Sequence, residues 1–168
     1  MSRWRAPAQP SSPYITATGY RALEAELQRL GVRRIDTVKH LAAAAAEGDR
    51  SENAEYIYRK KELREIDRRL GYLQRRMPKL TIVARAPASN ERVFFGAWVE
   101  LEDAAGARAR HRIVGSDELA QGDEYISIDA PLAQALLKHT LDDQILVHTT
   151  RGEACYTLVD IHYEELPS

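Results

Sequence analysis

The chain has 168 residues, of which 44% are hydrophobic and 29% charged, a balance typical of a folded protein with one domain or two small ones. Its single cysteine, Cys155, excludes an internal disulfide and fits a protein of the reducing cytoplasm. No stretch approaches the roughly 18 consecutive apolar residues of a membrane-spanning helix, so we expect no membrane partner.

Charge is divided unevenly along the chain. Residues 1–84 contain 17 Lys and Arg against 10 Asp and Glu, a net +7, whereas residues 85–168 contain 7 against 15, a net −8; the halves sum to −1. A basic half joined to an acidic half suggests that only one half faces a polyanion, either nucleic acid or an acidic protein surface. Residues 1–13 are rich in Arg, Pro and Ser and lack an apolar core, which predicts a disordered leader.

Hydrophobic residues recur at helical spacing from Thr18 to about Met77. From Leu63 onward the steps are 3, 4, 3, 4 and 3, which is the pattern of a heptad seam. Two such helices with a short connection predict an antiparallel coiled-coil hairpin over residues 14–84, with an acidic tip near 48–53. The expected seam residues are Leu23, Leu27, Leu30, Ile35, Val38, Leu41 or Ala42 and Ala45 in the first helix, and Tyr56, Leu63, Ile66, Leu70, Leu73, Met77 and Leu80 in the second.

Beyond a linker at residues 85–92 the hydrophobic period changes to two, which is typical of β-strands. A short helix is expected from about Pro131 to Lys138, with Asp129 placed to cap it. We therefore predict a small α+β domain over residues 93–168 with a mainly antiparallel sheet. Its strands are expected at Val93–Leu101, near Arg110–Val114, and at Glu124–Ile128, Gln144–Thr149 and Cys155–Tyr163.

Two acidic residues at the hairpin tip, Asp49 and Glu52, have two interpretations. They form a capping box, in which Asp49 caps the second helix and Glu52 bonds back to the Asp49 amide. Alternatively, the two carboxylates hold a hard divalent cation whose other ligands come from another molecule, since Mg²⁺ in proteins is usually bound by one or two carboxylates with phosphate and water. Beside a nucleic-acid phosphate, such a pair completes a two-metal phosphodiesterase site.

The second helix carries a strongly basic set of exposed positions. A solvated helix face with ion pairs between neighbouring turns explains such a pattern. Solvation alone does not require so few acids among these positions, which favours a binding face for a polyanion. The basic residues are Arg59, Lys60, Lys61, Arg64, Arg68, Arg69, Arg75 and Arg76.

The stretch Gly48-Asp49-Arg50-Ser51-Glu52-Asn53-Ala54-Glu55-Tyr56 resembles the hairpin-tip motif of the bacterial Gre transcript-cleavage factors. The resemblance covers nearly the whole chain, and the Phe94-Phe95 pair and the basic second helix are closer to the GreB branch than to GreA. It includes Thr18-Gly19-Tyr20, Lys60-Lys61, Arg64 to Arg69, Val93 to Glu100, Arg112 to Gly115, Tyr125 to Asp129, Pro131-Leu132-Ala133 and Ala135-Leu136-Leu137.

This resemblance implies a coiled-coil hairpin followed by a domain similar to FKBP-type folds. It implies that the hairpin enters the secondary channel of a backtracked bacterial RNA polymerase, where Asp49 and Glu52 help hold a second Mg²⁺ and the attacking water in the active centre of the polymerase. The chain itself is then no enzyme and binds no cofactor tightly by itself. It stimulates cleavage of the backtracked nascent RNA by the polymerase.

The same resemblance implies further contacts. Arg50, Arg59, Lys60 and Arg64 are expected to follow the extruded 3′ segment of the nascent RNA. The corner formed by Asp129 and Pro131 is expected to dock on the polymerase at the mouth of the channel, although Ala130 stands where the family usually has a serine. The protein is expected to act as a monomer in the cytoplasm.

Three other functions fit parts of the sequence. A related regulator of the secondary channel that does not stimulate cleavage has the same fold and docking corner, but retention of both tip acids argues against it. A peptidyl-prolyl isomerase is suggested only by the fold of the C-terminal half, and fold is poor evidence for function. A coiled-coil adaptor explains the hairpin but not the acid pair at its tip.

Overall fold

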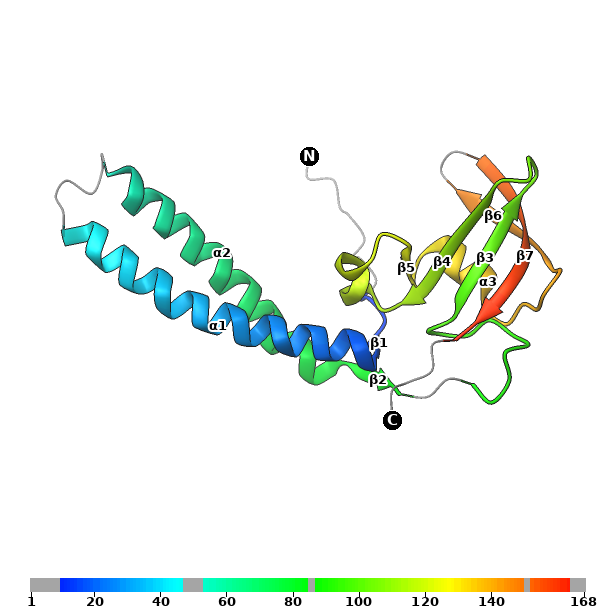
Figure 1. The fold of residues 1–168 in the computed structure, drawn as a ribbon, viewed down its shortest axis with the longest axis horizontal. Helices are drawn as coiled ribbons and strands as arrows, with labels where there is room; N and C mark the ends of the chain where they lie inside the picture. The colour runs from blue at the N-terminus through cyan, green and yellow to red at the C-terminus, as the bar shows by residue number, and fades with distance from the viewer. Residues whose placement is uncertain (1–9, 47–52, 85–86, 150–151, 164–168) are drawn as a thin grey trace, which may run out of the picture. The chain divides into compact units, whose positions relative to one another are not determined.

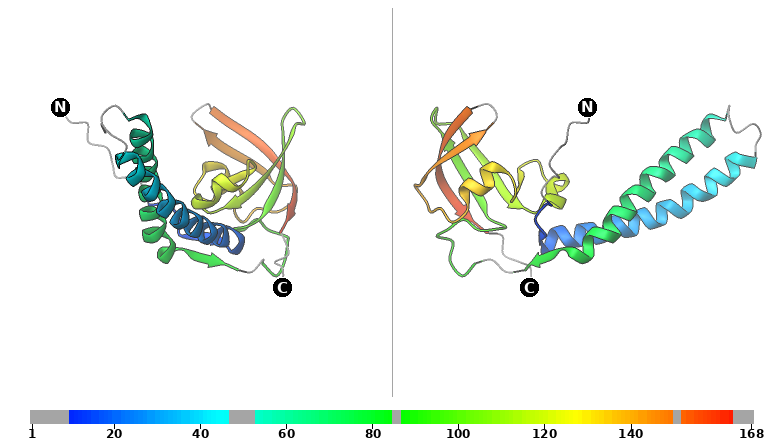
Figure 2. Two further views of the ribbon diagram at one scale, coloured as in Figure 1. Left: turned by 60° about the vertical axis from the view of Figure 1, so that its left-hand side comes forward. Right: turned by 180° about the vertical axis from the view of Figure 1, so that it is seen from behind.

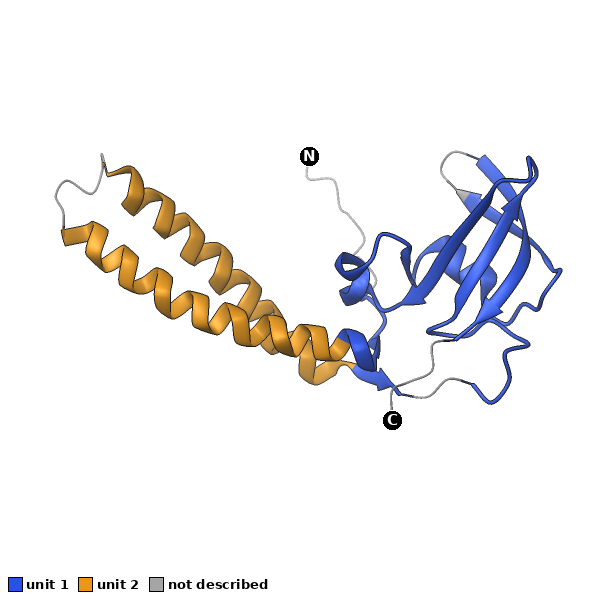
Figure 3. Ribbon diagram, viewed as in Figure 1, with its two compact units in different colours: residues 1–19, 81–168 blue, residues 20–80 orange. Residues whose placement is uncertain are grey.

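The computed structural model describes residues 10–46, 53–84, 87–149 and 152–163. Residues 20–80 form one compact unit, and residues up to 19 together with those from 81 onward form the other (Figure 3). The first unit is helical and the second contains a mixed sheet, so the expected α+β organisation in two parts is confirmed. The sequence assigned residues 14–19 and 81–84 to the hairpin, whereas their contacts place them in the sheet unit. Among the described residues, no helix is long and apolar enough to cross a membrane.

The helical unit consists of α1 (Ala17–Ala46) and α2 (Ala54–Arg76), with a single 3-10 turn (Met77–Lys79) where Pro78 ends α2. Contacts between the helices show that they run in opposite directions: Glu26 pairs with Arg69 near the start of α1, whereas the carbonyl of Ala44 accepts from Asn53 near its end. The ribbon shows the same antiparallel arrangement (Figure 1).

Of the predicted seam residues in and after α2, Ile66, Leu73 and Met77 are buried, and Tyr56, Leu63, Leu70 and Leu80 are half-buried. The third buried residue of α2 is Glu62, which the pattern did not predict. The prediction was wrong in the middle of α1, where Ile35 and Val38 are 59% and 39% exposed. The buried positions there are Thr37 and Ala44. A strict heptad from Leu23 passes through 27, 30, 34, 37, 41 and 44, so the seam keeps its register and accepts polar residues at 34 and 37.

The second unit is built on a five-stranded sheet in the order β5-β4-β3-β7-β6. Only β4 and β5 are parallel, so the predicted mainly antiparallel sheet is confirmed. The first strand was predicted to begin at Val93, but residues 93–97 are not part of it. A turn that contains Gly96, at a φ of +86°, lies before the strand. The strands are β3 (Trp98–Asp103), β4 (Arg108–Val114), β5 (Tyr125–Ser127), β6 (Gln144–Thr149) and β7 (Gly152–His162).

One face of this sheet is covered by the short helix α3 (Pro131–Leu136), which Figures 1 and 2 show from opposite sides. Ala133 and Leu136 of α3 are fully buried in the core that it forms with the sheet. The strand residues of that core include Val99, Leu101, Ile113, Ile145, Val147 and Leu158.

A second, two-stranded sheet pairs β1 (Tyr14–Thr16) with β2 (Thr81–Val83) in parallel. Beside it, the 3-10 segment η2 (Ser116–Gln121) contributes the fully buried carboxylate of Glu118. Glu118 accepts hydrogen bonds from the amide of Thr16 at 3.0 Å and from its hydroxyl. A Cβ added at Gly19 would lie 2.1 Å from Glu118 Oε1, so glycine is required at the start of α1 for this approach. These contacts connect the first turn of α1 to the sheet unit.

Candidate functional site

The N-terminus of α2 is capped by Asn53, which sequence reasoning did not single out. Its side-chain oxygen accepts from the amide of Tyr56 at 3.1 Å, which is the ordinary N-cap bond. Its side-chain nitrogen donates to the carbonyl oxygen of Ala44 at 2.8 Å. Asn53 therefore both begins α2 and fixes it to the last turns of α1.

The predicted tip residues Asp49, Arg50 and Glu52 lie outside the described residues. The described chain nevertheless bears on the capping-box interpretation, because α2 begins at Ala54 and Asn53 occupies its N-cap. The N-cap that the sequence assigned to Asp49 is thus held by another residue. Both acids belong to the segment 47–52, which connects the end of α1 to the start of α2. The hydrogen bond between Asn53 and Ala44 joins these two helix ends.

Ion pairs between the helices fix the register of the hairpin. Glu62, which is buried, accepts two hydrogen bonds from Arg33, at 2.6 and 3.0 Å, and one from Arg59 at 3.0 Å. Hydrogen bonding from the Arg33 guanidinium is the main reason that the pKa of the Glu62 carboxyl lies below its ordinary value. Glu26 receives both arms of the Arg69 guanidinium, at 2.7 and 2.8 Å, which lowers the pKa of Glu26 in the same way.

The predicted RNA-binding residues on α2 divide into two groups. Arg59 is held by the carboxylates of Glu55 at 2.7 Å and Glu62 at 3.0 Å, and these bonds raise its pKa. Lys60 and Arg64 are exposed, and within the described parts of the chain neither forms a salt bridge. The structure therefore leaves Lys60 and Arg64 available to a polyanion, whereas Arg59 is engaged inside the hairpin.

Further cations extend the exposed group along α2. Lys61, Arg64, Arg68 and Arg75 recur at steps of three, four and seven, which places them on one face of the helix. This face lies opposite the buried Ile66 and Leu73. All four cations are exposed. We call this set, together with Lys60, the basic face.

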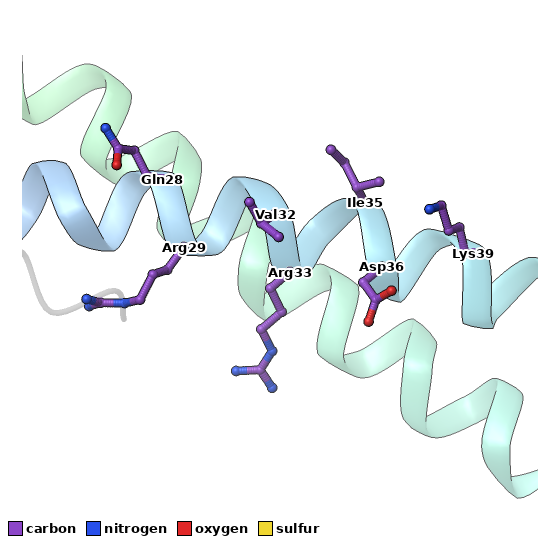
Figure 4. Close-up of a pocket in the computed structure, with 7 residues that line it drawn as sticks. All are labelled: Gln28, Arg29, Val32, Arg33, Ile35, Asp36 and Lys39. Atoms are coloured by element: carbon purple, nitrogen blue, oxygen red, sulfur yellow. The ribbon is translucent and has the colours of Figure 1, made fainter.

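The outer surface of α1 exposes two apolar side chains, and the sequence pattern placed one of them, Ile35, in the seam. Val32 is 71% exposed and Ile35 is 59% exposed, and polar and charged side chains surround both. Together they line a shallow groove of about 620 Å³, shown in Figure 4. Its residues are Gln28, Arg29, Val32, Arg33, Ile35, Asp36 and Lys39.

The predicted docking corner lies between β5 and α3. Pro131 occupies the first turn of α3, as expected, but the N-cap residue is Ala130 and Asp129 does not cap the helix. The Asp129 carboxylate instead accepts from Ser116 Oγ at 3.0 Å and from Ser12, whose amide donates at 2.9 Å. The corner is thus joined to a residue of the expected leader, 117 positions away.

Two aromatic residues of the sheet unit, Trp98 and Phe95, have different surroundings. Trp98 lies under the guanidinium of Arg110, 4.1 Å from the ring centroid, and stacks on His162. Phe95 packs against the hydrophobic core of the sheet unit instead, and its ring contacts Tyr14. Trp98 and Phe95 therefore do not support an aromatic-lined catalytic site.

Comparison with known proteins covers both units. Residues 13–82 match the family model described as "Transcription elongation factor, N-terminal", and residues 88–163 match "Transcription elongation factor, GreA/GreB, C-term". The chain is 54% identical to transcription elongation factor GreB of Xanthomonas axonopodis pv. citri, over 99% of this chain and all of that protein. It is 51% identical to GreB of Pseudomonas aeruginosa over the same shares. Among solved structures, GreA factor homolog 1 of Thermus thermophilus is 27% identical in sequence, with a TM-score of 0.39. The match covers 89% of this chain and 97% of the homolog.

Proposed function

This chain belongs to the GreA/GreB family of transcription elongation factors, and from that premise we propose that it stimulates cleavage of backtracked nascent RNA by bacterial RNA polymerase. The hairpin of α1 and α2 enters the secondary channel of the polymerase, and the acids of the connecting segment reach its active centre. The polymerase makes the cut, and this chain supplies ligands.

The observation that carries this proposal is the N-cap of α2. Because Asn53 caps the helix and joins it to Ala44, the helix does not need Asp49 as its N-cap. Two carboxylates in the short segment between these helix ends then lack the structural role that the capping box offered. Their chemistry, oxygen ligands of a hard cation, supports the second interpretation.

Asp49 and Glu52 fit a shared Mg²⁺ better than a resident one. Two carboxylates leave most positions of an octahedral ion to other donors, which in the polymerase are its own acids, phosphate and water. When bound, the ion supplies Lewis-acid stabilisation of the phosphodiester and activation of water. Asp49 and Glu52 orient it and add negative charge beside it.

The basic face supports a role in guiding RNA. Lys60, Lys61, Arg64 and Arg68 offer cations to a phosphate backbone without reading its sequence. Arg50 extends this set into the connecting segment, and Arg59 contributes by holding Glu55 and Glu62 in place. The exposed RNA 3′ segment of a backtracked complex is the polyanion that this face would contact.

The test is cleavage of 3′-labelled RNA in a backtracked complex assembled with cognate polymerase. We expect Asp49→Ala and Glu52→Ala each to reduce the stimulated rate by at least about tenfold, with binding to the polymerase retained. Removal of a metal ligand typically lowers the rate more than removal of a single hydrogen bond does. Glu65→Ala is the matched control, because Glu65 is an exposed acid of α2 outside the connecting segment. If the wild-type chain binds but does not accelerate cleavage, the non-cleaving regulator becomes the better account.

A further inference from the structure

Four residues of the expected leader, 10–13, lie against the docking corner. The amide of Ser12 donates to Asp129 Oδ2 at 2.9 Å, and its hydroxyl donates to Asp129 Oδ1. Two donors from one residue on the two oxygens of one carboxylate fix both the position and the orientation of the leader backbone. We call residues 10–13 the strap.

The carboxylate of Asp129 also organises its own side of this contact. Oδ2 accepts from Ser116 Oγ at 3.0 Å, and Ser116 Oγ lies 2.9 Å from Ser127 Oγ. The amide of Asp129 donates to Ser127 Oγ at 3.1 Å. The strap, η2 and the end of β5 therefore meet at Asp129 through linked hydrogen bonds.

The next residue of the strap, Pro13, is attached as well. The carbonyl of Pro13 accepts from the amide of Thr81 at 2.7 Å, where β2 begins. Two residues later, Ile15 is fully buried and Thr16 is bound by Glu118. Since Pro13 also restricts its own φ angle, the strap is fixed at Ser12 and Pro13, the two residues that precede β1.

A groove of about 570 Å³ opens beside this contact. The strap supplies one wall with Pro10 and Ser11, and the sheet unit supplies the other with Ser116, Asp129 and Gln134. Among these described lining residues Asp129 alone is charged, so the groove is complementary to a basic side chain. Pro131, the other residue of the docking corner, follows Asp129 by two positions, in the first turn of α3.

We propose that the strap is part of the surface that docks on RNA polymerase, and that the groove between the strap and Asp129 receives an arginine or lysine of the polymerase. Ser12 is the positioning residue, because it holds the strap on Asp129 and so keeps both walls of the groove in place. This inference rests on the proposed function and identifies a part of the docking surface outside the Asp129-Pro131 corner.

A competing arrangement makes the opposite prediction. If Asp129 contacts the polymerase only after releasing Ser12, the strap covers the docking corner and inhibits binding. Removal of the Ser12 hydroxyl would then strengthen binding. If Ser12 builds the surface, the same change weakens binding, because Asp129 loses the charge-assisted hydrogen bond from the Ser12 hydroxyl and keeps the bond from the Ser12 amide.

The experiment measures the equilibrium affinity of the full chain for core polymerase. We expect Ser12→Ala to weaken binding about three- to tenfold, and Ser12→Thr, which keeps the hydroxyl, to bind like the wild type. The double variant Ser12→Ala, Asp129→Ala is expected to bind no more weakly than Asp129→Ala alone, because Ser12 acts through Asp129. Ser89→Ala is the matched control: the Ser89 hydroxyl also serves a local bond, to the amide of Glu91 at 3.1 Å, far from the groove in sequence.

Thermal unfolding followed by circular dichroism establishes that each variant is folded. If Ser12→Ala binds the polymerase as tightly as the wild type, or more tightly, this inference is wrong. The proposed function still stands in that case, provided that the wild-type chain stimulates RNA cleavage. The inference is also wrong if the double variant binds the polymerase more weakly than Asp129→Ala alone, by the factor that Ser12→Ala costs in the wild type. A wild-type chain that does not bind the polymerase overturns both.

Discussion

At the scale of single residues, side chains that join distant parts of the chain determine where the candidate site lies. Asn53 is one example, since one amide group caps α2 and reaches the Ala44 carbonyl of α1. Ser12 with Asp129 and Thr16 with Glu118 are others, and they connect residues more than 100 positions apart. Each bond is modest in energy, but together they decide which segments are neighbours.

The two bonds of Asn53 can be separated by substitution. Asn53→Ala removes both and is expected to lower the free energy of unfolding by about 1 kcal/mol, the usual cost of losing an N-cap. Asn53→Asp keeps the acceptor for Tyr56 but removes the donor to Ala44, so we expect a smaller loss. Urea denaturation followed by helical circular dichroism measures both. Equal stability of Asn53→Ala and the wild type would show that the cap has no energetic role.

Only some of the site residues could be predicted from the sequence. The motif placed Asp49 and Glu52 between two helices, but it assigned the cap to Asp49, four residues before the observed one. A signal for Asn53 was present, because asparagine is among the preferred N-caps and Glu55 follows in the first turn. No such signal exists for Ser12 with Asp129, since nothing local to either residue indicates a partner 117 positions away.

At the scale of elements, the hairpin is held by an apolar seam interrupted by polar layers. Arg34 pairs with Asp67 at 2.6 Å, and Thr37 is 98% buried, both at heptad positions that the sequence pattern expects to be apolar. The predicted seam departs from the observed one after Leu30, where the predicted step to Ile35 is five residues and the heptad continues at 34. The repeat from Leu63 onward contains no step of five, and there Ile66 and Leu73 are buried as predicted.

Two other ion-paired carboxylates between the helices make the stability of the hairpin depend on pH. Glu26 and Glu62 have pKa values lowered below 4.5, mainly by hydrogen bonds from Arg69 and Arg33 respectively. A lowered carboxyl pKa means that the stabilisation is fully present above the pKa of the unfolded chain and is lost as pH falls through the folded pKa. We therefore expect the helical unit to lose stability on acidification below about pH 4.5.

Glu62→Gln tests the origin of this dependence. It is expected to cost about 1 kcal/mol at pH 7, because Arg33 and Arg59 lose a charged acceptor, and to flatten the dependence of unfolding free energy on pH in the acid range. Glu65→Gln, at an exposed position of α2, is the control. Denaturation curves at several pH values between 7 and 3 measure both. Parallel pH profiles for Glu62→Gln and the wild type would exclude Glu62 as a source.

At the scale of the whole molecule, the charge asymmetry read from the sequence is reproduced as a basic helix face. We expect the double variant Lys60→Ala, Arg64→Ala to bind a backtracked complex more weakly than the wild type, with a smaller dependence of affinity on salt, by roughly one unit in the log–log slope. Lys39→Ala with Lys79→Ala removes the same charge elsewhere in the helical unit. An equal loss in both double variants would assign the effect to net charge and not to the basic face.

If Asp49 and Glu52 supply ligands to Mg²⁺ in the polymerase, the Mg²⁺ dependence of cleavage must change when either is removed. The measurement is the rate of stimulated RNA cleavage as a function of Mg²⁺ concentration, at saturating concentrations of each variant. We expect Asp49→Ala and Glu52→Ala to shift the Mg²⁺ requirement to higher concentration, with part of the rate regained there, whereas Glu65→Ala superimposes on the wild type. Variants that lose rate equally at every Mg²⁺ concentration would contradict this role of the two acids.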